Sequence, residues 1–195
     1  MLPIEGFSPD PPETRWLTES GPDRGMQVLK DFWFRDPYGT TWMTPANWKI
    51  DGASIPRALW TLVGSPYTGD YRRASIVHDK ACNDASGNAA ARRAADKMFY
   101  RACREGGCSN FESTLLYIGV RIGALTPLVE AWNEPAQKMS GPRLARSYQE
   151  ERIEIDFRAT ADRVVRQGET DNVDELERRT DRALEIVTGI SVSGA

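Results

Sequence analysis

The amino-acid sequence predicts an α+β fold, in which a small N-terminal antiparallel β-sheet precedes an antiparallel helical core and a C-terminal helical hairpin. Three observations indicate this order. Strand-forming residues are concentrated in residues 26–50, helical patterns with capping residues occupy residues 70–132, and a strongly charged segment with helical spacing begins at residue 140. Apolar side chains make up 40% and charged side chains 27% of the 195 residues, which is typical of a globular chain rather than a disordered one.

The first part of the chain accounts for the strands. Residues 1–25 are rich in proline at their start, and we expect them to form an extended arm. Residues 26–34 are rich in β-forming side chains, residues 37–39 form a turn, and residues 40–43 and 47–50 give two further short strands. Short strands joined by short turns predict a small antiparallel sheet.

The middle of the chain predicts three helices. The first covers residues 70–82, with Asp70 as its capping residue, and the second covers residues 89–104, with Asn88 as its cap. The third covers residues 111–124. Because only a short turn joins the first two helices, we expect them to lie antiparallel and in contact.

The C-terminal segment, residues 140–195, predicts a helical hairpin. Apolar residues keep helical spacing on both sides of Gly168, and charges of both signs fill the remaining positions. Such a hairpin packs on the preceding domain or on a partner, or it forms a solvated helical tail, and the sequence leaves these alternatives open. The chain thus divides into an arm of residues 1–25, an α+β domain of residues 26–132 and the hairpin.

The charge and the cysteine content restrict the class of protein. The net charge of −3 and the pI of about 5.4 argue against binding of duplex nucleic acid, which usually needs a basic excess. The most apolar run, residues 115–129, is interrupted by Arg121 and Pro127, so we expect no transmembrane segment. The N-terminus lacks the pattern of a signal peptide, and the three cysteines are therefore expected to be thiols in a reducing compartment.

His78 is the only histidine of the chain and the first candidate for chemistry. It lies beside Asp79 on the first predicted helix, and the antiparallel arrangement can bring Asp96 of the next helix to face it. A carboxylate that accepts a hydrogen bond from one ring nitrogen leaves the other nitrogen basic, as is needed to deprotonate water. The alternatives are that His78 is structural, and that Arg92 pairs with Asp96 as a neighbour on the same helix.

Asp51 begins the run Asp51-Gly-Ala-Ser-Ile-Pro56, which predicts a tight corner between a strand and a helix. Such a corner can aim a carboxylate and backbone groups at a site. We therefore include Asp51 with His78 and Asp96 among the catalytic candidates. The alternative is that Asp51 only caps the turn through its own backbone.

Two different metal sites are compatible with the sequence. Asp79 and Asp51, together with backbone carbonyls of residues 64–69, offer the oxygen ligands that suit calcium. A rival zinc site would use His78, Cys82, Cys103 and Cys108. Because the spacing of the cysteines fits no established zinc signature, calcium is favoured over zinc.

Four blocks of sequence follow one another along the chain: DGASIPRALW, GSPYTGDYRRASIVHD, RRAADKMFYRACREGG and LLYIGVRIGA. In this order they resemble the DUF1353 proteins, an uncharacterised family found widely in bacteriophages and prophages. The resemblance covers residues 26–125. It implies a phage or mobile-element context, with the host cytoplasm or the virion as the location, but it implies no activity.

A more distant resemblance concerns mechanism. A helix with His-Asp, followed by a helix that reads Ala-Asp-x-x-Phe, is similar to the two catalytic helices of phospholipase A2. This resemblance implies that His78 is the general base for a water, that Asp79 binds calcium, and that Asp96 orients the histidine, with Phe99 packed nearby. The chain departs from the phospholipase pattern at Cys82, where a tyrosine is usual, and it has no recognisable calcium loop.

The sequence therefore predicts a phage-associated hydrolase that acts on an ester, with a membrane phospholipid as the candidate substrate. The alternative is a non-enzymatic phage virion, tail or assembly protein, or a protein that interacts with the host, in which His78, Asp79 and Asp96 are structural. In that case residues 140–195 would bind a phage structural protein or a host protein.

Overall fold

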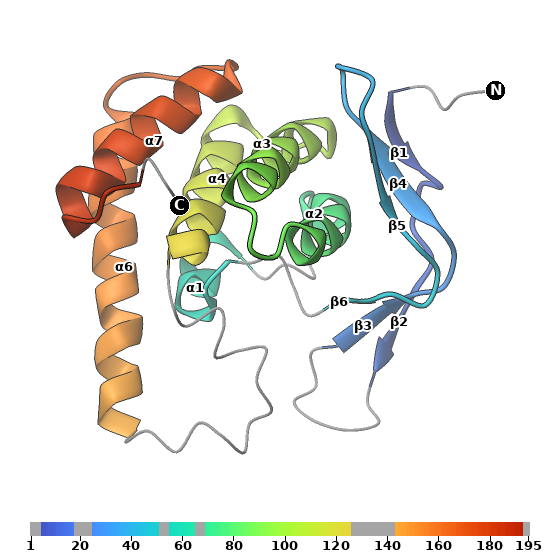
Figure 1. The fold of residues 1–195 in the computed structure, drawn as a ribbon, viewed down its shortest axis with the longest axis horizontal. Coiled ribbons are helices and arrows are strands. Elements are labelled where there is room, and N and C mark those ends of the chain that lie inside the picture. The colour runs from blue at the N-terminus through green and yellow to red at the C-terminus, as the bar shows by residue number, and fades with distance from the viewer. Residues whose placement is uncertain (1–4, 18–24, 51–54, 65–68, 126–142, 193–195) are drawn as a thin grey trace. The chain divides into compact units, whose positions relative to one another are not determined.

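The computed structural model describes residues 5–17, 25–50, 55–64, 69–125 and 143–192 (Figure 1). The chain forms two compact units, the first of residues 1–53 and 66–109 and the second of residues 54–65 and 110–195. Small antiparallel sheets come first and helices follow, which confirms the predicted α+β class. Within the described residues, no helix combines the length and the apolar character that a membrane span requires.

The described strands of the first unit form two three-stranded antiparallel sheets. One sheet has the order β1 (Gly6–Ser8), β4 (Phe32–Arg35), β5 (Thr41–Thr44), and the other has the order β2 (Thr14–Leu17), β3 (Gly25–Val28), β6 (Lys49–Ile50). Residues 29–31 are exposed and interrupt the strand expected over residues 26–34. Asp31 accepts a hydrogen bond from the backbone N–H of Ala46 at 2.8 Å. Residues 29–31 separate β3 from β4, and the two strands belong to different sheets.

Two of these strands come from the segment that the sequence predicts as an extended arm. β1 pairs with β4, and β2 pairs with β3. The Phe7 ring of β1 stacks on Phe32 of β4, with ring centroids 5.8 Å apart. Prolines 9, 11 and 12 fall between β1 and β2, where they remove no hydrogen bond from a strand ladder.

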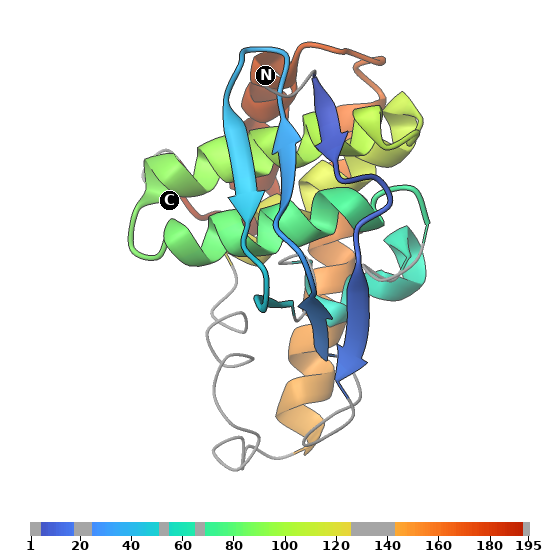
Figure 2. The ribbon, with the colours of Figure 1, turned by 90° about the vertical axis from the view of Figure 1, so that its right-hand side faces the viewer.

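Helix α2 (Arg72–Asp84) packs against strands β4, β5 and β6 of the first unit. Phe32 and Phe34 of β4 and Ile76 of α2 are at most 1% exposed, so they belong to the core of this unit. The Thr44 hydroxyl of β5 donates a hydrogen bond to the carbonyl of Ile76 at 3.2 Å. Figure 2 shows α2 and the neighbouring helix α3 (Ala89–Glu105) side by side behind the strands.

The two helix starts differ in how they are capped. The Asn88 side chain accepts a hydrogen bond from the backbone N–H of Ala91 at 3.0 Å, which confirms it as the N-cap of α3. The prediction that Asp70 caps the preceding helix is wrong. Helix α2 begins at Arg72, its N-cap position is Tyr71, and no side chain caps it. The predicted contact between the two helices is confirmed.

The second unit contains a short turn of helix at η1 (Arg57–Leu59), followed by α1 (Trp60–Val63), α4 (Asn110–Leu125), α6 (Arg143–Val165) and α7 (Val173–Thr188). Helices α6 and α7 contact each other and both contact α4. Gly168 has a φ of +83° in the turn between α6 and α7, and Asn172 caps α7. The hairpin therefore packs on α4, while the predicted domain boundaries stay a prediction.

A buried ion pair joins α4 to α7 within the second unit. The Arg121 side chain is fully buried, and its guanidinium donates a hydrogen bond to Asp181 of α7 at 3.1 Å. A buried arginine is costly unless an acceptor compensates its charge. Asp181 therefore fixes which face of α7 lies against α4.

Candidate active site

His78 lies in the middle of α2, on the side of the helix that faces α3. Its side chain is 0% exposed. The ring of Phe99, from α3, packs on the imidazole with centroids 4.6 Å apart and an interplanar angle of 36°. Helical spacing along α2 places Ala74, Ala81 and Cys82 near the same face, three or four residues from His78. The imidazole is thus held by packing from both helices.

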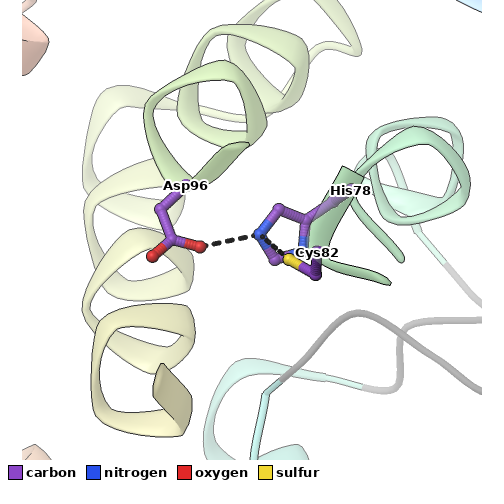
Figure 3. Close-up of side chains that lie close together, drawn as sticks. All are labelled: His78, Cys82 and Asp96. Carbon is purple, nitrogen blue, oxygen red and sulfur yellow. Dashed lines mark hydrogen bonds and ion pairs between the residues drawn. The ribbon is translucent and has the colours of Figure 1, made fainter. Parts of the chain in front are cut away.

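Asp96 of α3 provides the main polar partner of the imidazole. Its Oδ1 atom lies 2.9 Å from Nε2 of His78, and its side chain is also 0% exposed (Figure 3). Arg92, one helical turn earlier on α3, donates from Nε to the same oxygen at 3.1 Å. The carboxylate therefore contacts both His78 and Arg92, which the sequence left as alternative partners of Asp96.

These contacts indicate the tautomer of His78. Asp96 already accepts a hydrogen bond from the Arg92 guanidinium, and a carboxylate in its ionised form can only accept hydrogen bonds. The proton of a neutral imidazole then belongs on Nε2, which donates to Asp96. Nδ1 is left without a proton and is the basic nitrogen of the ring.

The environment also sets the charge of the ring. Burial lowers the pKa of His78 below its ordinary value of 6.5, and the Arg92 charge acts in the same direction. The hydrogen bond and the charge of Asp96 oppose this effect but do not overcome it. His78 is therefore neutral at pH 7. Burial also disfavours the charged form of Arg92, but Asp96 and Cys82 outweigh it and raise the pKa of that guanidinium.

Cys82 completes the cluster from α2, one helical turn after His78. Its Sγ lies 3.3 Å from Nε2 and 3.7 Å from Nδ1 of the imidazole. Unlike His78 and Asp96, Cys82 is partly exposed. Figure 3 shows that the contacts to the carboxylate and to the thiol meet at the same ring nitrogen, Nε2. We refer to His78, Cys82, Arg92 and Asp96 as the histidine cluster.

The predicted site residues Asp79, Cys103 and Cys108 lie outside this cluster. Asp79 is partly buried, and its carboxylate accepts a hydrogen bond from Nε1 of Trp48 at 3.4 Å. Asp51 falls outside the described residues. Cys103 and Cys108 are buried thiols, and neither belongs to the group of close metal-ligating atoms formed by His78, Cys82 and Asp96.

The sequence did not predict that Arg92 and Cys82 both belong to one cluster with His78 and Asp96. Pairing of Arg92 with Asp96 was the alternative to the His78–Asp96 contact, and both contacts are present at the same oxygen. Cys82 was considered as a zinc ligand together with the other cysteines, with packing between the helices as the alternative. Its spacing of four residues from His78 was the signal that places it on the same helical face.

A pocket of about 340 Å³ also lies in the first unit. It is lined by Pro12, Glu13, Thr14, Met26, Leu29, Arg72 and Ile76. None of these residues belongs to the histidine cluster. The pocket therefore gives no direct route to the imidazole.

Comparison with known proteins shows a family to which part of the chain is similar. Residues 26–120 match the family described as "Protein of unknown function (DUF1353)". The predicted resemblance is confirmed for this stretch, which contains the whole histidine cluster. The description names no activity, so the similarity to phospholipase A2 stays a prediction.

Two curated relatives come from Sinorhizobium fredii (strain NBRC 101917 / NGR234). "Uncharacterized protein y4jT" is 34% identical over 95 residues, which cover 49% of this chain and 27% of the relative. "Uncharacterized protein y4iH" is 33% identical over 111 residues, which cover 54% of this chain and 45% of the relative. The chain thus matches less than half the length of either relative. No solved structure gives a significant match.

Proposed function

We propose that the protein is a hydrolase in which His78 is the general base for a water molecule and Asp96 orients the imidazole. The observation that supports this most is the 2.9 Å contact between Nε2 of His78 and Oδ1 of Asp96. It assigns the ring proton to the nitrogen that faces Asp96 and leaves the other nitrogen able to accept a proton. A positioned base of this kind contributes about 10²- to 10⁴-fold to a reaction rate.

The proposed reaction is the hydrolysis of an ester. Nδ1 of His78 takes a proton from water while the water oxygen attacks the ester carbonyl carbon. The resulting imidazolium is stabilised by the Asp96 carboxylate. It then returns the proton to the leaving alkoxide as the carbon–oxygen bond breaks. A phospholipid is the substrate class that the phospholipase A2 resemblance favours.

Calcium is not needed for this sequence of steps. Calcium takes about six to eight oxygen ligands. Asp79, one of the predicted calcium ligands, lies among the described residues, and its carboxylate accepts the Trp48 hydrogen bond. The calcium site stays a prediction, and no step is assigned to that ion.

A second candidate function has its own supporting observation. His78 and Asp96 are both fully buried, which also suits a structural network that holds α2 and α3 together. In this alternative the protein is a non-enzymatic phage virion, tail or assembly protein, or a protein that interacts with the host. Substitution of His78 would then lower stability without removing any catalysis.

The test is hydrolysis of a short-chain phosphatidylcholine and of p-nitrophenyl butyrate by the full chain. We expect His78→Gln to lower kcat by about 10²- to 10⁴-fold, because the glutamine cannot act as a base. Asp84→Asn is the matched control, since Asp84 is an exposed acid on the same helix. This control should hydrolyse both esters at the wild-type rate.

Circular dichroism and thermal unfolding of each variant separate the two candidate functions. A folded His78→Gln protein with undiminished activity would rule out the proposed base. A folded wild-type protein that hydrolyses neither ester, together with a lower melting temperature for His78→Gln, would favour the structural alternative.

A further inference from the structure

The histidine cluster brings three different metal-ligating atoms close together. Nε2 of His78 lies 2.9 Å from Oδ1 of Asp96 and 3.3 Å from Sγ of Cys82 (Figure 3). Ligand atoms of the three side chains all lie within 4.8 Å of one another. Ligands around a tetrahedral zinc ion, at bond lengths of about 2.0–2.3 Å, are separated by roughly 3.5 Å. The three side chains are therefore close enough to ligate one ion after small side-chain movements.

We propose that His78, Cys82 and Asp96 form a binding site for a divalent cation with affinity for sulfur and nitrogen, such as zinc. A thiolate, an imidazole and a carboxylate are the three ligand types that zinc uses in proteins. Within the described part of the chain, no other group of three such residues comes this close together. This ligand set differs from the Cys3His set considered from the sequence, because Asp96 takes the place of Cys103 and Cys108.

The surroundings of the three ligands suit a site with an open position. His78 and Asp96 are fully buried and held by packing, whereas Cys82 is partly exposed and gives the ion a side from which to enter. Arg92 donates a hydrogen bond to Asp96, and such outer contacts orient a ligating carboxylate. The thiolate and the carboxylate offset the two charges of a divalent ion, and Arg92 adds one positive charge beside the site. Water would supply the fourth ligand.

Occupancy of this site would switch off the proposed base. A metal ion on Nε2 leaves the neutral imidazole to carry its single proton on Nδ1, which can then no longer accept one from water. The Cys82 thiol loses its proton to the solvent as the metal–sulfur bond forms. This inhibitory consequence depends on the proposed hydrolase function, but the binding site itself does not.

Cobalt(II) is the direct probe of the site, because a bond between cobalt and a thiolate gives a near-ultraviolet charge-transfer band. We expect the full-length protein, kept reduced with a phosphine, to develop this band with one cobalt per chain and to lose it when zinc is added. Cys82→Ala should weaken cobalt binding by at least about 100-fold, because it removes a direct ligand. Cys108→Ala is the matched control, since Cys108 is a second cysteine of the same unit, and it should bind as the wild type does.

The proposal is overturned if the folded wild-type protein gives no charge-transfer band. It is also overturned if the band survives in Cys82→Ala or disappears in a folded Cys108→Ala protein. Cys103→Ala replaces the control if Cys108→Ala does not fold. The spectrum is recorded without substrate, so a failure of the hydrolase proposal would leave the cobalt band unchanged. A failure of the metal proposal would leave ester hydrolysis by the metal-free protein unchanged.

Discussion

The protonation of His78 is set first by burial and then by two charged neighbours that act in opposite directions. Asp96 stabilises the charged imidazolium through a hydrogen bond and through its negative charge, whereas Arg92 disfavours it. Burial has the largest effect and keeps the pKa of His78 below its ordinary value. A base that must accept a proton at neutral pH benefits from this balance, because it remains unprotonated until the reaction begins.

The contribution of Arg92 can be measured by replacing it with glutamine. Arg92→Gln removes the positive charge beside His78 and should therefore raise the pKa of the imidazole towards its ordinary value. Because the chain has one histidine, nuclear magnetic resonance of protein labelled at histidine gives its titration directly. Arg93→Gln, a change at the next position, should move this pKa much less. An unchanged or lower pKa in Arg92→Gln would contradict the charge balance described above.

The sequence could predict some of these side-chain positions but not others. The short connection between two helices was sufficient to predict that His78 faces Asp96. Consecutive residues of a helix point about 100° apart, so Asp79 could not share the inward face with His78. That Arg92 and His78 share one carboxylate oxygen depends on the distance between the helices, which helical spacing alone does not give.

At the scale of elements, the site depends on the α2–α3 pair. The turn between the two helices includes Gly87, whose φ of +75° favours glycine. At the far end of α3, an added Cβ on Gly106 would lie 2.5 Å from the backbone oxygen of Asp70, so only glycine fits there. Asp70 therefore takes part in a close backbone contact instead of capping α2. This close approach depends on how distant segments pack, which the sequence alone does not give.

Removal of the N-cap of α3 tests how much this capping hydrogen bond contributes to the stability of the α2–α3 pair. Asn88→Ala removes the side-chain acceptor for the Ala91 N–H and should lower the free energy of unfolding by about 1 kcal/mol. Urea denaturation of the purified protein measures this loss. The control is Asn83→Ala, at an exposed position near the end of α2, which should change stability by less than about 0.5 kcal/mol. Equal losses for the two variants would show that the cap contributes nothing specific.

At the scale of the whole molecule, the order of elements was predictable and their grouping was not. The β-rich segment and the three central helices follow from residue propensity and periodicity, which are local properties. The grouping of residues 54–65 with the helices after residue 110 depends on contacts between distant segments. The same holds for β1 and β2, because pairing partners outside a segment decide whether an extended chain becomes a strand.

The family match indicates which part of the chain would carry the proposed activity. It covers residues 26–120 and so includes α2, α3 and the complete histidine cluster, whereas the α6–α7 hairpin follows it. The proposed base belongs to the matched segment. A role for residues 140–195 in binding a phage or host protein is a separate proposal.

The central claim, that neutral His78 is the base, is tested most directly by following ester hydrolysis and the titration of His78 over the same pH range. Because only the neutral ring can accept a proton, activity should persist below pH 6.5 and fall as the pH drops through the lowered pKa of His78. The midpoint of the activity loss should equal the midpoint of the His78 resonance titration, and both should move up together in Arg92→Gln. An activity midpoint that differs from the His78 titration, or that stays in place while the titration of His78 moves, would contradict the account.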